Sequence, residues 1–201
     1  MSDIFANPPA APLALFGVWL GEARTAEPND AEAMALATYN PDDMLPNIRM
    51  VLLKTYDERG FTFHTNLESQ KGLEIAAHPY GAACFHWKSL RRQIRLRGRM
   101  ESVDAAEADA YFATRSRQSR VGAWASQQSR PLTHYSDLQT AATTHTQNFE
   151  GEEVPRPPYW GGCRLVVSEV EFWQDGAHRL HHRLVYKRTD NNEWQTHLLY
   201  P

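Results

Sequence analysis

Glu171-Phe172-Trp173-Gln174 and, shortly after it, His178-Arg179-Leu180-His181-His182-Arg183-Leu184 are the most informative segments of this 201-residue chain. Both are predicted to be strands, and a strand directs alternate side chains to opposite faces. Arg179, His181 and Arg183 would then share one face. Two guanidinium groups beside an imidazole are costly to pack unless an anionic or electron-rich group lies against them. The pattern indicates either a binding surface or a solvated edge strand.

A second segment, Arg49-Met50-Val51-Leu52-Leu53-Lys54, is apolar between two cations. The run 61–66 follows the predicted turn 57–60, so the two runs are expected to form a hairpin. Ser69 is a favourable N-cap for a helix that runs to about His78 and ends before Pro79. Cations at strand ends beside a helix N-terminus could bind a phosphate, or they could be the ordinary solvated ends of a buried strand.

The composition limits the class of protein. A chain of 201 residues can form one domain with a substantial core, and a net charge of −3 does not favour nucleic-acid binding. No apolar run is long enough to cross a membrane and no signal peptide is recognisable, so we expect a cytoplasmic protein. Cys84 and Cys163 lack metal-like spacing and are predicted to be reduced thiols.

The order of the predicted elements indicates an α+β protein built around an antiparallel barrel. Helices are expected at 13–23, 69–78, 102 or 104 to 114, 119–127 and 132–149. Further strands are expected at 34–39, 82–87, 91–103, 163–174, 179–187 and 194–199. Turns are expected at 40–43 and 190–192, with a proline-rich connector at 150–158. We divide the chain into a disordered N-terminus, a core with helices, and final strands that complete the sheet, at 1–12, 13–150 and 151–201.

Five arginines lie in or beside the predicted strand at 91–103, namely Arg91, Arg92, Arg95, Arg97 and Arg99. Gln93, Arg95 and Arg97 alternate with Ile94 and Leu96, which should face the core. A basic strand could bind nucleic acid, but the acidic total and the lack of interleaved aromatic residues argue against this function. A solvated barrel face accounts for most of these arginines.

A separate pattern suggests an anion site. Tyr111 and Arg115 are four residues apart in a predicted helix and therefore share a face. Ser119 lies near the start of the next helix, where its hydroxyl and free N–H groups suit an anion. Alternatively, Arg115 is a plain surface residue.

Three histidines raise the alternative of a metal site. His178 and His182 would lie on the strand face opposite to that of His181, and no carboxylate or thiol completes a ligand set. The sequence therefore predicts no metal.

Several short motifs together resemble the pyridoxamine (pyridoxine) 5′-phosphate oxidase family. They occur in the order Arg-Met-Val-Leu-Leu-Lys, Thr-Asn, Ser-x-Lys, Arg-Gln-Ile, Tyr-Phe-x-x-Arg, Gly-Ala-Trp-Ala-Ser, Gln-Ser, Tyr-Trp-Gly-Gly, Phe-Trp-Gln and Arg-Leu-His-x-Arg. The resemblance extends from about Leu13 to Pro201. It implies an antiparallel split β-barrel with peripheral helices that forms a homodimer, with 13–150 as the FMN-binding core and 151–201 contributing to the dimer interface and active site.

The resemblance also implies FMN as the cofactor. Its ligands within one chain would be Arg49, Met50, Val51, Leu52, Leu53, Lys54, His64, Thr65, Gln70, Lys71 and Gln93. The partner subunit would add Gln128, Ser129, Trp173 and Arg183. Gln70 stands where many members have arginine, so a neutral hydrogen bond would replace one charged contact to the phosphate. His64 replaces a common tyrosine, with little loss expected because the contact is largely through the backbone.

For the substrate, the resemblance implies a phosphate site formed by Lys54, Tyr111, Arg115 and Ser119. Arg179 would lie over the pyridine ring near the reacting carbon. His181 would orient the substrate, and an imidazole can exchange protons near neutral pH. The implied reaction is hydride transfer from C4′ of pyridoxine or pyridoxamine 5′-phosphate to N5 of FMN, after which dioxygen accepts the electrons and yields hydrogen peroxide.

Two other functions are compatible with the same motifs. A phenazine-biosynthesis flavin oxidase shares the flavin residues, but its substrate has no phosphate to occupy a site at Tyr111, Arg115 and Ser119. A non-catalytic protein that binds flavin or pyridoxal phosphate would not need Arg179 and His181. No glycine-rich dinucleotide motif supports a nicotinamide partner. The segment before Leu13 lacks the basic, tyrosine-containing arm that many members fold over the substrate.

Overall fold

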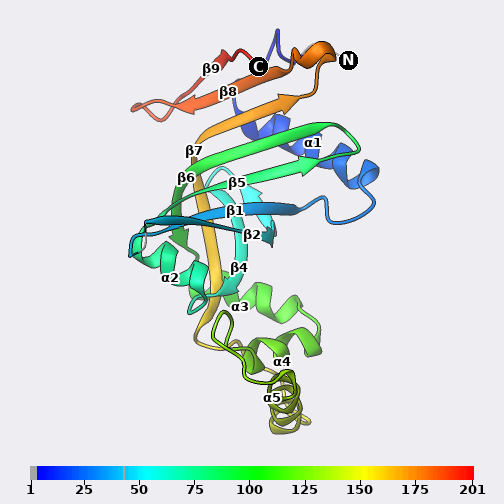
Figure 1. Ribbon diagram of the computed structural model, residues 1–201, viewed down its shortest axis with the longest axis vertical. Coiled ribbons are helices and arrows are strands. Elements are labelled where there is room, and N and C mark those ends of the chain that lie inside the picture. Colours follow the sequence, from blue (N-terminus) through cyan, green and yellow to red (C-terminus); the bar gives the residue numbers. More distant parts are fainter. Residues whose placement is uncertain (1–3, 43) are drawn as a thin grey trace.

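The computed structural model describes residues 4–42 and 44–201. This part of the chain forms one antiparallel sheet with flanking helices (Figure 1). The main strand order is β2-β1-β5-β6-β7-β4-β3, and β8 and β9 extend the sheet beside β7. The strands are β1 (Ala33–Asn40), β2 (Leu45–Leu52), β3 (Thr55–Asp57), β4 (Gly60–Asn66), β5 (Tyr80–Trp87), β6 (Arg92–Ser102), β7 (Trp160–Gln174), β8 (His182–Arg188) and β9 (Trp194–Leu198).

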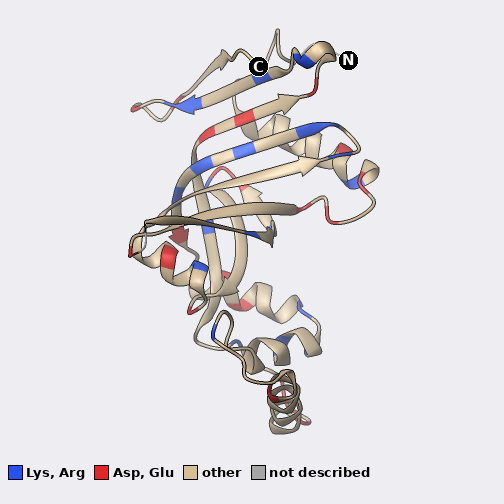
Figure 2. Ribbon diagram, viewed as in Figure 1, with Lys and Arg blue, Asp and Glu red and all other residues tan. Residues whose placement is uncertain are grey.

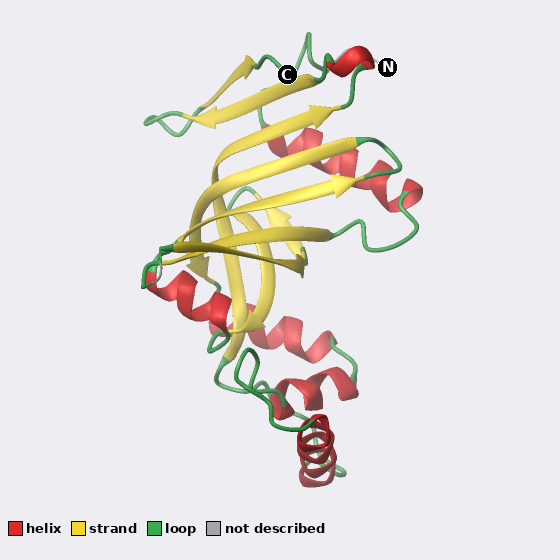
Figure 3. Ribbon diagram, viewed as in Figure 1, coloured by secondary structure: helices red, strands yellow, loops and turns green. Residues whose placement is uncertain are grey.

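The helices other than α2 lie toward the two ends of the molecule (Figure 1). α3, α4 and α5 gather at one end, and α1 lies toward the other, nearer the chain termini (Figures 1 and 3). Their bounds are α1 (Pro12–Ala26), α2 (Gln70–Ala77), α3 (Ala105–Thr114), α4 (Arg117–Ala125) and α5 (Tyr135–Asn148), with a short 3-10 helix, η1, at Ala177–Arg179.

The long strand β7 connects the two halves of the sheet. β4 pairs with residues 160–165 of β7 and β8 pairs with residues 169–174, while β6 lies along its other edge. A β-bulge between Arg97 and Gly98 shifts the register of β6 against β7. A Cβ atom at Gly98 would lie 2.0 Å from the Val166 carbonyl oxygen, so the close approach there requires glycine. The sheet curls without closing, and the predicted antiparallel split barrel of α+β class is confirmed.

An aromatic core lies beneath α1. The Phe16 ring meets the rings of Phe61 and Phe85 edge-on, with centroids 4.8 and 5.4 Å apart. Burying side chains of this size stabilises the fold by about 1.5–3 kcal/mol each. The helix contributes one apolar face at three- and four-residue spacing, formed by Leu15, Phe16, Trp19, Leu20 and Ala23.

The predicted hairpin is wrong in one of its strands. The short β3 pairs with β4 across the turn at 57–60. The segment 49–52 belongs to β2, which instead pairs with β1, so that Arg49 lies opposite Leu36. The backbone leaves β2 at Leu53, whose N–H donates to the Glu32 carbonyl at 2.9 Å. The apolar run 49–54 therefore ends β2 and continues into the connection to β3.

The strand predicted to begin at Arg179 begins three residues later. His178 and Arg179 have positive φ angles of 55° and 67° within η1, and β8 starts at His182. Gly176 permits the bend, because a Cβ atom there would lie 2.0 Å from the Leu180 carbonyl oxygen. The alternation expected for Arg179, His181 and Arg183 therefore does not hold.

The helix starts are set by their caps. Ser69 caps α2 as predicted, and Asp104 caps α3. α4 begins at 117 rather than 119 because the Ser116 hydroxyl accepts from the Ser119 N–H at 3.2 Å. α5 begins at 135 rather than 132, and the His134 N–H donates to the Asp137 carboxylate there.

The N-terminal segment contacts the sheet. The Phe5 ring stacks on His182 with centroids 5.0 Å apart, and the Tyr186 hydroxyl donates to the Pro9 carbonyl at 3.0 Å. Phe5 and Pro9 therefore contact the sheet, whereas the sequence predicted a disordered N-terminus at 1–12. Residues 1–3, and Asp43 of the predicted turn at 40–43, lie outside the described residues.

Two arginines of β6 pair with carboxylates on β7, and Arg92 pairs instead with Glu22 of α1. Figure 2 shows the basic positions of β6 beside acidic positions of the neighbouring strand. Arg95 contacts Glu171 at 2.9 Å, and Arg97 contacts Glu169 at 3.4 Å. The exposed Arg97–Glu169 pair contributes at most about 1 kcal/mol, whereas Glu171 is buried. The Arg95 and Arg97 contacts are thus cross-strand ion pairs.

Two searches of the described residues gave negative results. No helix within residues 4–42 and 44–201 is long and apolar enough to cross a membrane. Over the same ranges there is no group of three or more histidine, cysteine or acidic residues that could hold a metal ion.

Candidate functional site

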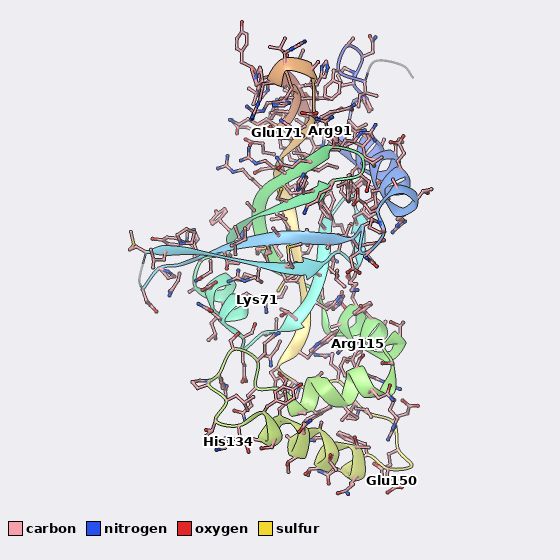
Figure 4. All side chains as sticks on the ribbon, turned by 45° about the vertical axis from the view of Figure 1, so that its right-hand side comes forward. Lys71, Arg91, Arg115, His134, Glu150 and Glu171 are labelled. Carbon is pink, nitrogen blue, oxygen red and sulfur yellow. The ribbon has the colours of Figure 1, made fainter. Side chains whose placement is uncertain are left out.

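A cavity of about 680 Å³ lies where β2 and β4 face α3 and α4. Lys71 and Arg115, both labelled in Figure 4, border it from α2 and from the end of α3. It is lined by Met50, Val51, Leu52, Lys54, His64, Thr65, Asn66, Lys71, Tyr111, Arg115, Ser116, Ser119, Gly122, Ala123, Ser126, Gln128 and Trp160.

A second cavity, of about 380 Å³, shares Met50, Lys71 and Gln128 with the first and also contains Arg49, Gln70 and Ser129. The predicted site residues in these two cavities are called the cavity group below. Leu53 is not among them, because its side chain is buried in the core with 3% exposure. The cavity group comprises Arg49, Met50, Val51, Leu52, Lys54, His64, Thr65, Gln70, Lys71, Tyr111, Arg115, Ser119, Gln128 and Ser129.

Lys71 is a buried cation in the first turn of α2. Its Nζ donates to the hydroxyls of Thr65 and Ser69 at 3.1 and 3.2 Å, and to the Gln128 side-chain oxygen at 3.2 Å. Burial lowers the pKa of Lys71, and the charge of Arg49 lowers it further. Because all three acceptors are neutral, the site favours an anionic ligand, and the N-terminus of α2 adds partial positive charge.

Arg49 has a different environment, because a buried carboxylate compensates its charge. Its Nη2 lies 3.2 Å from Glu74 Oε2, and its Nη1 donates to the Thr38 hydroxyl. Asn47 donates to the other oxygen of Glu74 at 2.6 Å. The Glu74 side chain is only 4% exposed, so this network holds the Arg49 guanidinium in place beside the second cavity.

Arg115 is a second cation of the cavity and, unlike Lys71, has incomplete hydrogen bonds. Its Nη1 is buried and has no hydrogen-bond partner within the described ranges of the chain. The guanidinium lies 4.9 Å from the Trp160 ring centroid and 5.4 Å from that of Phe112, and burial lowers its pKa. An anion in the cavity would supply the missing acceptor.

Two neighbours of Arg115 complete a second cationic region. Ser119 is the third residue of α4, and its hydroxyl lies 2.8 Å from that of Ser116. The Lys54 Nζ lies 5.9 Å from the centroid of the Tyr111 ring. The cavity therefore has one cationic region at Lys71 and another at Lys54 and Arg115.

His64 lies in an aromatic stack on the cavity wall. Its ring centroid is 4.1 Å from that of Tyr111 and 5.2 Å from that of Trp160, with interplanar angles of 20° and 13°. Burial lowers the pKa of His64 to about 4, against a weaker opposing effect of Glu107. The imidazole is therefore neutral at neutral pH and adds no charge beside Arg115.

The other predicted site residues lie at the opposite end of the sheet. Gln93, Trp173 and Arg183 lie side by side on β6, β7 and β8, because the register pairs Trp173 with both of the others. Arg179 and His181 lie in the bend just before β8. These five residues are called the strand-row group. Figure 4 shows Glu171, which neighbours this row, well away from Lys71 and Arg115.

His181 is held from three sides. Its ring centroid lies 4.7 Å from that of Trp173, and its Nδ1 lies 3.0 Å from Asp175 Oδ1. The Gly176 N–H also points at Nδ1, at 3.2 Å. Asp175 in turn pairs with Arg91. Nδ1 accepts from Gly176 when it is unprotonated, and a proton on Nδ1 would instead bond to Asp175 and leave Nε2 as the acceptor.

Three residues depart from the expected division between subunits, and one of them is Ser129, which was expected from the partner but borders the second cavity of its own chain. Gln128 was expected from the partner but lies in the same chain as Lys71, 3.2 Å from its Nζ. Gln93 was expected beside the cavity of its own chain but lies next to Trp173. Gln93 therefore groups with the residues expected from a partner.

Sequence reasoning missed several residues around these groups. Trp160 lines the cavity and supports Arg115, a role that its motif Tyr-Trp-Gly-Gly does not reveal by itself. Glu74 and Glu171 were not selected, because a lone glutamate in a helix or strand does not reveal its partner. Only the folded sheet brings each of them to an arginine distant in sequence.

The fold and these two groups define a class: an open split barrel with separate cationic regions for phosphate-bearing ligands. Comparison with known proteins gives the family. Residues 20–147 match the family model described as pyridoxamine 5′-phosphate oxidase. Residues 160–201 match the one described as the pyridoxine 5′-phosphate oxidase C-terminal dimerisation region. The chain belongs to the pyridoxamine 5′-phosphate oxidase family.

Relatives and solved structures agree with this assignment. Proteins named pyridoxine/pyridoxamine 5′-phosphate oxidase from Sphingopyxis alaskensis and Brucella canis are 55% and 53% identical to the chain. These alignments cover 94% and 96% of this chain and 87% and 95% of the relatives. The crystal structure of PhzG from Burkholderia lata, in complex with tetrahydrophenazine-1-carboxylic acid, superposes with a TM-score of 0.93 at 31% identity, covering 100% of this chain and 98% of that one. An FMN-binding protein from Nostoc punctiforme shares the fold, with a TM-score of 0.75 at 19% identity and coverage of 96% and 99%.

Proposed function

We propose that this chain is an FMN-dependent oxidase that converts pyridoxamine 5′-phosphate and pyridoxine 5′-phosphate to pyridoxal 5′-phosphate. The observation that carries the proposal is one cavity with two separate cationic regions, at Lys71 and at Arg115. Among the residues that the structure describes, no carboxylate is hydrogen-bonded to either of these side chains. Two phosphorylated ligands, a cofactor and a substrate, account for both regions. Identities of 53–55% over most of the chain to oxidases of this name support it.

The residues of the cavity group suit FMN in charge and hydrogen bonding. Lys71, Arg49 and the N-terminus of α2 would bind the phosphate, while Thr65, Gln128 and the backbone of 50–53 offer bonds to the flavin ring. Gln70 borders the second cavity and adds a neutral donor there. FMN, when bound, accepts the hydride from the substrate and passes the electrons to dioxygen, which yields hydrogen peroxide.

For the substrate, Lys54, Arg115 and Ser119 would hold the phosphate, with Tyr111 closing the same region. Arg179 and His181 would act on the other side of the pyridine ring. With the proton on His181 Nδ1 bonded to Asp175, Nε2 would accept a hydrogen bond or a proton from the substrate. These residues bind and orient, and the site they enclose keeps the reacting groups together.

The proposal requires a homodimer. The strand-row group lies too far from its own cavity to act there, so a second copy would supply Gln93, Trp173, Arg179, His181 and Arg183. The match of residues 160–201 to a dimerisation region supports this assembly. We place the enzyme in the cytoplasm, where its two free cysteines would remain reduced.

The test is direct. The purified protein should be a yellow dimer that releases peroxide with phosphorylated B6 vitamers and not with the unphosphorylated forms. The visible spectrum, size-exclusion chromatography with light scattering, and a peroxide assay measure these properties. A folded protein that stays colourless and monomeric in excess FMN would contradict the proposal, and a yellow protein without turnover would identify a binding protein instead.

A second candidate is a phenazine-type flavin oxidase, because PhzG superposes so closely. The identity to PhzG, 31%, is well below the 53–55% shared with the B6 oxidases. Peroxide release with reduced phenazine carboxylates, compared with pyridoxine 5′-phosphate in the same assay, decides between them.

A further inference from the structure

A buried carboxylate joins two cations beside the strand-row group. Glu171 of β7 is 5% exposed. Its Oε1 accepts from Arg183 Nε at 2.7 Å, and its Oε2 accepts from Arg95 Nη1 at 2.9 Å. Burying a carboxylate is costly unless charged donors satisfy it, and here each oxygen has one.

The register places this carboxylate beside the row. Glu171 is two residues from Trp173 on the same strand, so both side chains lie on one face of the sheet. Arg183 lies directly opposite Trp173, and Arg95 lies directly opposite Glu171. Glu171 is therefore on the face that carries Gln93, Trp173 and Arg183.

Two contacts fix the guanidinium of Arg183. Glu171 binds its Nε, and the Tyr200 carbonyl accepts from its Nη1 at 3.1 Å. Its Nη2 makes no hydrogen bond within residues 4–42 and 44–201. The planar group is thus held by the protein at two of its nitrogens, and the third nitrogen, Nη2, remains for a ligand.

The group formed by Glu171, Arg95 and Arg183 differs from an ordinary ion pair in its net charge. An arginine is protonated at any working pH, so Glu171 is not needed to keep Arg183 charged. With Arg95 as a second cation, the three residues carry a net charge of +1 and remain attractive to an electron-rich ligand. Arg97 and Glu169 lie on the same two strands and form a simple pair at 3.4 Å, with side chains 60% and 28% exposed.

We propose that Glu171 is a positioning residue for the flavin, which acts by holding Arg183 in the orientation that contacts the cofactor in the partner subunit's cavity, with Arg95 as the compensating cation. The inference rests on the proposed function, because it takes FMN to be the ligand of Arg183. It assigns a role to a buried side chain that does not itself touch the cofactor.

The test compares Glu171→Gln with Glu169→Gln as the matched control. Glu171→Gln should weaken FMN binding about tenfold or more, the range set by losing one charge-assisted hydrogen bond. The dissociation constant is measured from the fluorescence of released FMN, and the flavin midpoint potential should shift in the same variant. The KM for pyridoxine 5′-phosphate should change little, because the substrate phosphate site lies elsewhere. Glu169→Gln should leave all of these values unchanged.

A double-mutant cycle tests the route of the effect. If Glu171 acts through Arg183, Glu171→Gln combined with Arg183→Gln should bind FMN no more weakly than Arg183→Gln alone. Additive losses would overturn the inference, as would wild-type affinity in Glu171→Gln or its conversion to a monomer. Should Glu171→Gln fail to fold, Glu171→Asp keeps the charge, shortens the side chain and should give the same loss of affinity. Wild-type protein that binds no FMN would defeat the proposed function itself, which is a different result.

Discussion

The cavity group and the strand-row group both contain cations, but the hydrogen-bond partners of the two sets differ in charge. In the described part of the chain, the acceptors of Lys71 are all neutral and Arg115 lacks an acceptor for Nη1. In the row, Arg183 is bonded to Glu171, and His181 lies against Asp175. The first set retains its charge for a ligand, whereas the second is held in a fixed orientation.

This difference indicates how the two halves of a shared site would divide their work. Anion binding requires cations that are incompletely neutralised, and such groups reduce the stability of the folded chain. Orientation requires fixed side chains, and carboxylate partners provide them at little cost in stability. Within the cavity, Arg49 resembles Arg183 of the strand-row group, because a buried carboxylate, Glu74, holds its guanidinium in place.

The largest expected effect is on Arg179, in the row. Arg179→Ala should reduce kcat/KM for pyridoxine 5′-phosphate by about 10²–10³-fold, the loss typical of removing one electrostatic contact to the reacting group. The protein should remain yellow, because no cavity residue changes. Steady-state peroxide assays and the visible spectrum measure the two properties. His178→Asn is the control. It changes a neighbouring residue with positive φ to asparagine, which tolerates that conformation, and should retain activity. A colourless Arg179→Ala would show that this residue binds the flavin instead.

Lys71 should show the opposite combination of effects. Lys71→Met should weaken FMN binding by about 10²-fold through loss of a charged contact to the phosphate. The melting temperature of the FMN-free protein should be unchanged or higher, because a buried charge with neutral acceptors has been removed. Flavin titration and thermal denaturation of the same sample test both parts. A destabilised variant that still binds FMN would mean that Lys71 is structural.

The sequence predicted most of the cavity group, because its residues lie in short motifs on β2, β4, α2 and α3. Helix spacing alone placed Tyr111 and Arg115 together, and Ser69 was correctly identified as a cap. These features depend on local geometry, which the sequence encodes directly. The pairing of β2 with β1 is a non-local choice, and the predicted hairpin missed it.

The row was less predictable for a physical reason. Strand alternation fails at His178 and Arg179, where positive φ angles interrupt the extended backbone. The association of Gln93 with Trp173 depends on the register of β6 against β7, which includes a bulge. Neither the bulge nor the partners of Glu171 can be read from one strand at a time.

Arg115 offers a smaller effect that distinguishes the two regions of the cavity. Arg115→Gln should raise the KM for pyridoxine 5′-phosphate by about tenfold, consistent with losing a charged hydrogen bond that has no substitute. FMN affinity should stay at the wild-type value. Kinetics with pyridoxine 5′-phosphate, and flavin titration, give the two numbers. Arg117→Gln, a neighbour bonded to the backbone carbonyls of 149 and 152, is the control. A loss of FMN in Arg115→Gln would show that the two cationic regions of the cavity bind the same ligand.

The smallest effect concerns His64 and the pH dependence of stability. Burial lowers the pKa of His64 from 6.5 to about 4. Between these values the unfolded chain binds a proton that the folded chain does not, so stability falls as the pH decreases from 6.5 toward 4. After allowance for partial solvent exposure, the contribution is about 1 kcal/mol. His64→Phe keeps the stack with Tyr111 and Trp160 and removes the titrating group, so its free energy of unfolding should lose less between pH 6.5 and 4 than that of the wild type. Urea denaturation of the FMN-free proteins at both pH values measures the difference. Equal losses would show that His64 is already solvated, and the aromatic stack would then not keep water from the cavity wall beside Arg115.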